Sequence, residues 1–224
     1  MNSVCDIKKF ILEKTVDYIQ EMPLDVYALY YFINAKEGNA KVPTLSLMYN
    51  TLSEIGEVGI EPVEACWNIA FWETDELPII GNNEKTTSES KRTGKMLSEW
   101  FSTNGYNSLE IESDPFDDSF EHTVGYRVLS EIIEEIAPDV KKAAKDHFQR
   151  DVVLLLGEYS YMPMDYQRIT AMNGVEANAF IEYYEKMEDS NDFVDLSMIE
   201  GRECEDYGKI FSEFIEKIKE KYKS

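Results

Sequence analysis

The chain has little positive charge and few of the side chains that enzymes use most. Its 224 residues hold 22 Lys or Arg against 44 Asp or Glu, a formal net charge of −22, and only 2 His. This imbalance excludes nucleic acid and anionic membranes from the expected partners, because like charges repel and binding would release no counterions. The partner class that the charge favours is a basic protein.

Cysteine and long apolar runs are also scarce. Cys5, Cys66 and Cys204 are widely separated and odd in number, which argues against a disulfide framework and against a zinc site. The N-terminal stretch carries charges within its apolar part, unlike a signal peptide. No run approaches the roughly eighteen apolar residues that a membrane-spanning helix needs. We therefore expect a cytoplasmic protein of bacterial type.

Catalytic motifs are missing as well. The sequence contains no G-x-S-x-G, HExxH, P-loop or GxGxxG motif, so we predict no catalytic residue and no cofactor. The best metal candidate combines hard oxygen ligands with one imidazole, and consists of Asp114, Asp117, Asp118, Glu121 and His122. Its spacing departs from an EF-hand loop, and acids before a helix commonly serve as caps. A carboxylate- or metal-dependent hydrolase using this cluster is the enzymatic alternative.

What is abundant is apolar and aromatic sequence, 43% and 12% of the chain, which indicates a folded body. Apolar periodicity predicts helices at 3–21, 88–101 and 124–148, with Pro138 ending or kinking the last, and helical stripes at 175–187 and 207–218. It predicts strands at 26–33, 45–49, 67–72 and 152–156, with a loop around Pro78.

The first two strands are expected to form an antiparallel hairpin with a loop longer than two residues. Their connection is too short for a crossover helix. We therefore predict an α+β fold, a single domain over residues 1–224, with a mainly antiparallel sheet of about four or more strands and several helices.

The acidic residues are unevenly distributed along the chain. No Lys or Arg occurs from Val42 to Asn83, and Arg127 is the one basic residue among ten acids from Leu109 to Asp139. Such stretches are either a solvated surface or an electronegative docking face. Trp67 and Trp72 lie within the first stretch, and they are either contact residues of an interface or core residues. The predicted partner contacts are Glu57, Glu61, Glu64, Trp67, Trp72, Asp75, Glu76, Asp114, Asp117 and Asp118.

The segment Trp67-Asn68-Ile69-Ala70-Phe71-Trp72, which follows an aromatic pair of predicted strands, resembles a family of small uncharacterised bacterial proteins. Members of this kind are regarded as immunity proteins of polymorphic toxin systems. The resemblance implies an acidic, cytoplasmic, non-enzymatic protein that binds a basic toxin domain and blocks it, and it supplies no catalytic residues. A homo-oligomeric structural or assembly protein is a second alternative, which an exposed self-complementary apolar patch would support.

Overall fold

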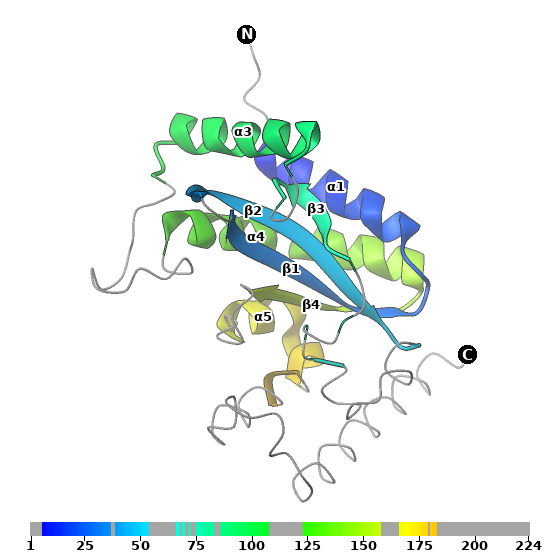
Figure 1. The fold of residues 1–224 in the computed structure, drawn as a ribbon. Helices are drawn as coiled ribbons and strands as arrows, with labels where there is room; N and C mark the ends of the chain where they lie inside the picture. Colours follow the sequence, from blue (N-terminus) through cyan, green and yellow to red (C-terminus); the bar gives the residue numbers. More distant parts are fainter. Residues whose placement is uncertain are drawn as a thin grey trace, which may run out of the picture.

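The computed structural model describes residues 6–36, 39–53, 66, 67, 69, 72, 75–82, 86–107, 123–157, 166–178 and 180–182. Its elements are α1 (Ile7–Glu21), β1 (Val26–Lys36), β2 (Asn39–Thr51), β3 (Leu77–Ile80), α3 (Ser88–Thr103), α4 (Val124–Phe148), β4 (Val153–Gly157), α5 (Tyr166–Asn173) and the 3₁₀ helix η4 (Gly174–Ala177). The four strands form one sheet in the order β3-β2-β1-β4 (Figure 1). The α+β fold class is confirmed.

The β1–β2 hairpin forms the centre of this sheet. Val26 to Ile33 are each at most 2% exposed, so the strand predicted at 26–33 is confirmed and is buried on both faces. The predicted long loop is wrong, because β1 ends at Lys36 and β2 begins at Asn39, with two residues between them. The ends of β1 and β2 next to this turn lack the alternation of apolar residues by which strands are predicted. Backbone hydrogen bonds do not need such an alternation, so the strands pair further than the sequence indicates.

Helices α1 and α4 cover one face of the sheet and pack against each other behind it in the view of Figure 1. The Tyr31 hydroxyl lies 3.0 Å from Thr15 Oγ1 of α1, and both side chains are buried. Because side chains alternate along a strand, Leu29 and Ile33 share this face with Tyr31. The buried stripe of α1 has one residue per turn and consists of Ile7, Ile11, Thr15 and Ile19.

The opposite face of the sheet is aromatic. Tyr30 and Phe32 lie on it, with ring centroids 6.3 Å apart. The Trp72 ring meets Tyr30 edge-on, with centroids 6.2 Å apart. Tyr27, at a register shift of the β1–β2 ladder, meets Trp67 edge-on at 5.9 Å. A bulge of this kind changes the direction of a side chain, which explains how Tyr27 and Tyr30 both reach the tryptophans.

The predicted strand at 67–72 is wrong. Cys66 and Trp67 are helical, Ile69 is in a 3₁₀ turn, and the Trp72 amide donates to the Ile69 carbonyl. The third strand is instead β3, where a loop around Pro78 was expected, and it pairs antiparallel with β2. Short apolar runs fit a helical turn as well as a strand, and an edge strand tolerates proline.

The other long elements match the sequence pattern. Helix α3 extends to Thr103, two residues beyond the predicted end, and the turn after it contains Gly105 at φ 77°, a conformation that favours glycine after a helix. Helix α4 runs through the exposed Pro138 as one helix, so the alternative that Pro138 ends it is wrong. Strand β4 follows and pairs parallel with β1, so the sheet is mixed, with two of its three pairings antiparallel. The predicted helical stripe at 207–218 lies outside the described residues.

Candidate interaction surface

The structure describes four of the ten predicted partner contacts: Trp67, Trp72, Asp75 and Glu76. The other six lie outside the described residues, namely Glu57, Glu61, Glu64, Asp114, Asp117 and Asp118. The described part of the predicted set therefore consists of two tryptophans and two carboxylates.

Trp67 is a core residue. It is 1% exposed, and its ring packs edge-on against Tyr27 on one side and Phe180 on another, with the Phe180 centroid 5.6 Å away. Edge-to-face aromatic pairs of this kind stabilise a core beyond the area they bury. The core interpretation of this tryptophan therefore holds, and we leave it out of the surface proposed below.

Trp72 is also buried, at 6% exposed, and its polar atom is used inside the protein. Its Nε1 donates to the Cys66 carbonyl at 3.2 Å, and the Tyr27 hydroxyl donates to the same oxygen at 2.8 Å. Burial raises the pKa of the Cys66 thiol well above its ordinary value, so the thiol stays protonated and is not a nucleophile at neutral pH. These contacts anchor the Cys66–Trp72 segment to the sheet.

Asp75 and Glu76 are the described carboxylates of the predicted set, and they immediately precede β3. Asp75 is exposed and Glu76 is half-buried. The Ser46 hydroxyl of β2 donates to Glu76 Oε2 at 3.1 Å, so the sheet holds this carboxylate in one position. Asp75, with its side chain in solvent, is the described residue of this pair that is best placed to meet a cationic partner.

Acids on α4 are neutralised by residues from distant parts of the sequence. Glu135 pairs with Lys8 at 2.9 Å and Glu134 with Arg168 at 3.0 Å, while Glu131 pairs with Arg127 one turn earlier at 2.8 Å. The second acidic stretch, predicted from Leu109 to Asp139, is therefore partly compensated by the fold. Sequence spacing does not reveal Lys8 or Arg168 as the partners, because they lie 127 and 34 residues away.

The described residues contain one imidazole, that of His147, near the end of α4. Its Nε2 lies 3.2 Å from the carbonyl of Met22, the residue that follows α1, so this histidine joins two helix ends. Among the described residues no three His, Cys, Asp or Glu are grouped closely enough to hold a metal ion. The cluster from Asp114 to His122 lies outside them.

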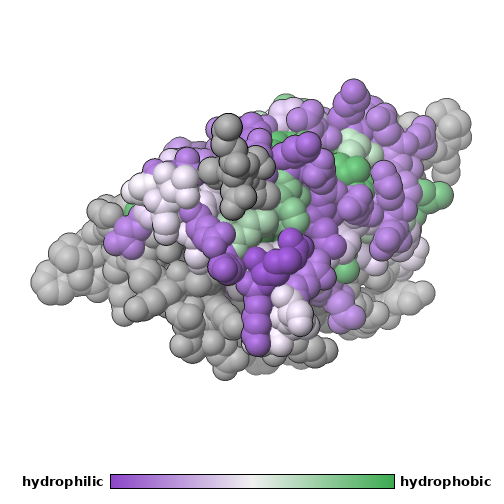
Figure 2. Space-filling view, turned by 90° about the horizontal axis from the view of Figure 1, so that it is seen from above, coloured by the Kyte–Doolittle hydropathy of each residue, from purple (hydrophilic) through white to green (hydrophobic). Residues whose placement is uncertain are grey.

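Exposed apolar surface in the described ranges is scattered. Viewed from above, apolar side chains are visible between hydrophilic ones (Figure 2). The large apolar side chains that are exposed there are Leu24, Tyr106 and Val175, which come from three separate segments. None of the described helices is long and apolar enough to cross a membrane.

One residue with a specific polar role was not predicted. Asn173, at the end of α5, bonds through its side chain to the backbone of β4. The available signal is the Asn173-Gly174 pair, which marks a helix end but does not show where the amide points.

Searches against protein-family models, curated proteins and solved structures found no match to this chain.

Proposed function

We propose that this chain is a non-enzymatic binding protein that docks a basic protein partner, and that the partner is a toxin domain which it neutralises. The observation that carries the proposal is the uneven charge along the sequence, with no Lys or Arg from Val42 to Asn83 and one basic residue among ten acids from Leu109 to Asp139. Negative charge needed only for solubility could be spread anywhere on a surface, whereas charge that steers a partner has to be concentrated.

The contacts proposed for docking are the acids Glu57, Glu61, Glu64, Asp75, Glu76, Asp114, Asp117 and Asp118. Exposed Asp75 supports this assignment for the first stretch, because it lies at the start of β3 with its carboxylate in solvent. A toxin that acts on nucleic acid must itself be basic to bind phosphate, so its charge would complement these acids. The resemblance of residues 67–72 to immunity-like proteins points to the same class of partner.

The test is affinity capture at low ionic strength followed by binding kinetics with the purified partner. We expect a basic protein whose association rate falls steeply between about 50 and about 500 mM salt, because the screening length between exposed charges falls from about 14 Å to about 4 Å over this range. The variant Glu61→Lys with Glu64→Lys should slow association and leave dissociation nearly unchanged.

A matched control separates a docking face from net charge alone. Asp17→Lys with Glu21→Lys makes the same charge change on exposed positions of α1, and we expect a much smaller effect on the association rate. Equal slowing by both double variants would show that only total charge matters. Salt-independent capture, or a nucleic acid as the captured species, would overturn the proposal.

A further inference from the structure

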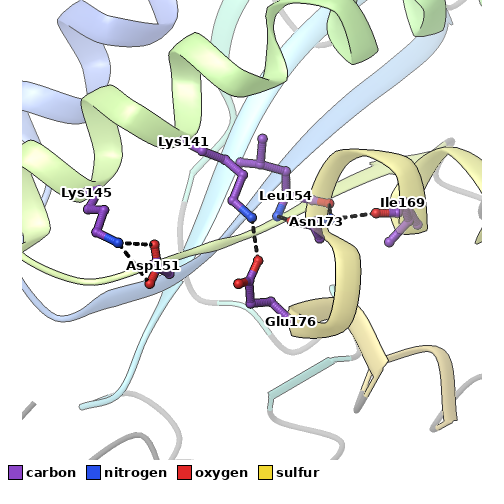
Figure 3. Close-up of polar contacts among 7 residues, drawn as sticks. All are labelled: Lys141, Lys145, Asp151, Leu154, Ile169, Asn173 and Glu176. Carbon is purple, nitrogen blue, oxygen red and sulfur yellow. Dashed lines mark hydrogen bonds and ion pairs between the residues drawn. The ribbon is translucent and has the colours of Figure 1, made fainter. Parts of the chain in front are cut away.

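The outer edge of β4 is closed by a side chain. Among the residues that the structure describes, β4 pairs with β1 on one side only and is the last strand in the sheet. On its other side, the Leu154 amide donates to Asn173 Oδ1 at 2.7 Å, and Asn173 Nδ2 donates to the Leu154 carbonyl at 2.7 Å (Figure 3). A side-chain carboxamide has the donor and acceptor of a peptide group, so Asn173 takes the place that a neighbouring strand would fill.

Asparagine fits this position closely. Its second Nδ2 hydrogen goes to the Ile169 carbonyl at 2.8 Å, one turn earlier in α5, and the residue is 5% exposed. Both donors and the acceptor are therefore used in a buried place. Aspartate would put a carboxylate against two carbonyl oxygens, and leucine would leave both Leu154 groups without these bonds. Gly174 follows at φ 66° and turns the chain into η4.

Ion pairs hold this unit against α4. Arg168 of α5 contacts Glu134 at 3.0 Å, and Glu176 of η4 contacts Lys141 at 2.6 Å. Figure 3 shows the Lys141–Glu176 pair beside Asn173. The cover of β4 is thus fixed by one buried amide, by two partly exposed ion pairs, and by buried apolar side chains of α5 and η4, among them Ile169 and Ala177.

The two outer strands of the sheet differ in how well their own sequences discourage pairing with a further strand. β3 is four residues long and contains Pro78, whose carbonyl accepts the Tyr18 hydroxyl at 2.7 Å. Proline and short length both discourage strand addition. The β4 run from Val152 to Leu156 contains five consecutive apolar residues without a charge or a proline. Such a run pairs readily with a copy of itself, and a two-fold axis would make that pairing antiparallel.

We propose that Asn173 prevents this protein from pairing with itself: its side-chain amide occupies the β4 edge, and its loss opens β4 to antiparallel pairing with β4 of a second copy. The occupant is a second copy because the exposed strand would be uncharged and self-complementary. The net charge of −22 on each chain opposes this association, so pairing should increase as salt screens the repulsion.

The test uses the full chain with Asn173→Leu, a substitution of similar size that cannot make these hydrogen bonds. Sedimentation velocity should show the wild type at the mass of one chain and the variant moving to twice that mass with rising concentration and rising salt. At low concentration, the Leu154 amide should exchange its hydrogen on the order of tenfold faster than in the wild type, and protection should return as the dimer forms. Asn178→Leu, an exposed position beyond η4, is the matched control and should change neither reading.

If Asn173→Leu does not fold, a second variant tests the same proposal. Glu134→Gln with Glu176→Gln removes both ion pairs and leaves the Asn173 hydrogen bonds in place, so it should shift the mass in the same direction by a smaller amount. A wild type that already pairs through β4, or folded variants that stay at one chain mass with Leu154 still protected, would overturn the proposal. The outcome is independent of the partner proposal, because salt should strengthen self-pairing and weaken docking of a basic protein.

Discussion

The buried tyrosine between the sheet and α1 should make the protein sensitive to alkali. Tyr31 is fully buried, and burial raises the pKa of its phenol far above the ordinary value, while the hydrogen bond with Thr15 lowers it slightly. The unfolded chain therefore loses this proton first as pH rises through about 10. Stability due to Tyr31 is complete below that pH and is lost progressively above it.

The magnitude follows from proton linkage. Each proton that the unfolded state has released and the folded state retains lowers the free energy of unfolding by about 1.4 kcal/mol per pH unit. For a phenol that starts to titrate near 10 in the unfolded chain, the loss between pH 10 and 11 is about 1 kcal/mol. Tyr31→Phe removes this loss and also removes the hydrogen bond to Thr15, at a cost of about 1 kcal/mol.

The assay is urea unfolding of the wild type and Tyr31→Phe at several pH values from 8 to 11. We expect the variant to be about 1 kcal/mol less stable at pH 8, and the wild type to lose about 1.4 kcal/mol relative to it by pH 11, so that the difference closes. The buried Cys66 thiol adds an alkaline loss of the same sign to both proteins, so it cancels in the difference. Tyr106→Phe, at an exposed tyrosine, serves as the control. Parallel pH profiles for the wild type and Tyr31→Phe would refute the reasoning.

Three further substitutions test the packing, each by urea unfolding. Trp67→Ala removes a buried ring and should destabilise the protein by about 3–5 kcal/mol; a cost below 1 kcal/mol would show that this ring is not in the core. Pro138→Ala restores a backbone donor inside α4 at an exposed position, and should stabilise by up to about 3 kcal/mol. Gly81→Ala places a Cβ 2.8 Å from Thr44 Cγ2, at a residue with φ 68°. It should therefore lower the free energy of unfolding more than Gly105→Ala does, where φ is 77° and nothing lies within 4 Å of the added Cβ. Equal costs for the two glycines would contradict that contact.

Much of the fold could be predicted from the sequence, because long regular elements leave a clear apolar pattern. The run from Val26 to Ile33 is aromatic and β-branched, which predicts a strand buried on both faces. Helix α4 has apolar residues at helical spacing over several turns, and that signal outweighs Pro138. In both elements the apolar pattern extends over more residues than an alternation that arises by chance.

Short elements could not be predicted in the same way. The alternation of large residues between Trp67 and Trp72 fits a strand, yet Cys66 and Ile69, three residues apart, also fit one helical turn. What decides between them is tertiary: the Cys66 carbonyl receives two side-chain donors, from Tyr27 and Trp72. β3 has four residues and a proline, so its only signal is pairing with β2.

The candidate site shows the same limit for charge. The count from Leu109 to Asp139 treats ten acids as equivalent, but packing gives Glu134 and Glu135 basic partners from α5 and α1. Acids that the fold has already paired add little to the attraction of a distant cation, since the pair is nearly neutral beyond a few ångströms. The steering charge must then come from acids without such partners, of which exposed Asp75 is the described representative of the predicted set. Asp75→Lys should therefore slow association with a basic partner more than Glu135→Lys does, although the two changes alter net charge equally.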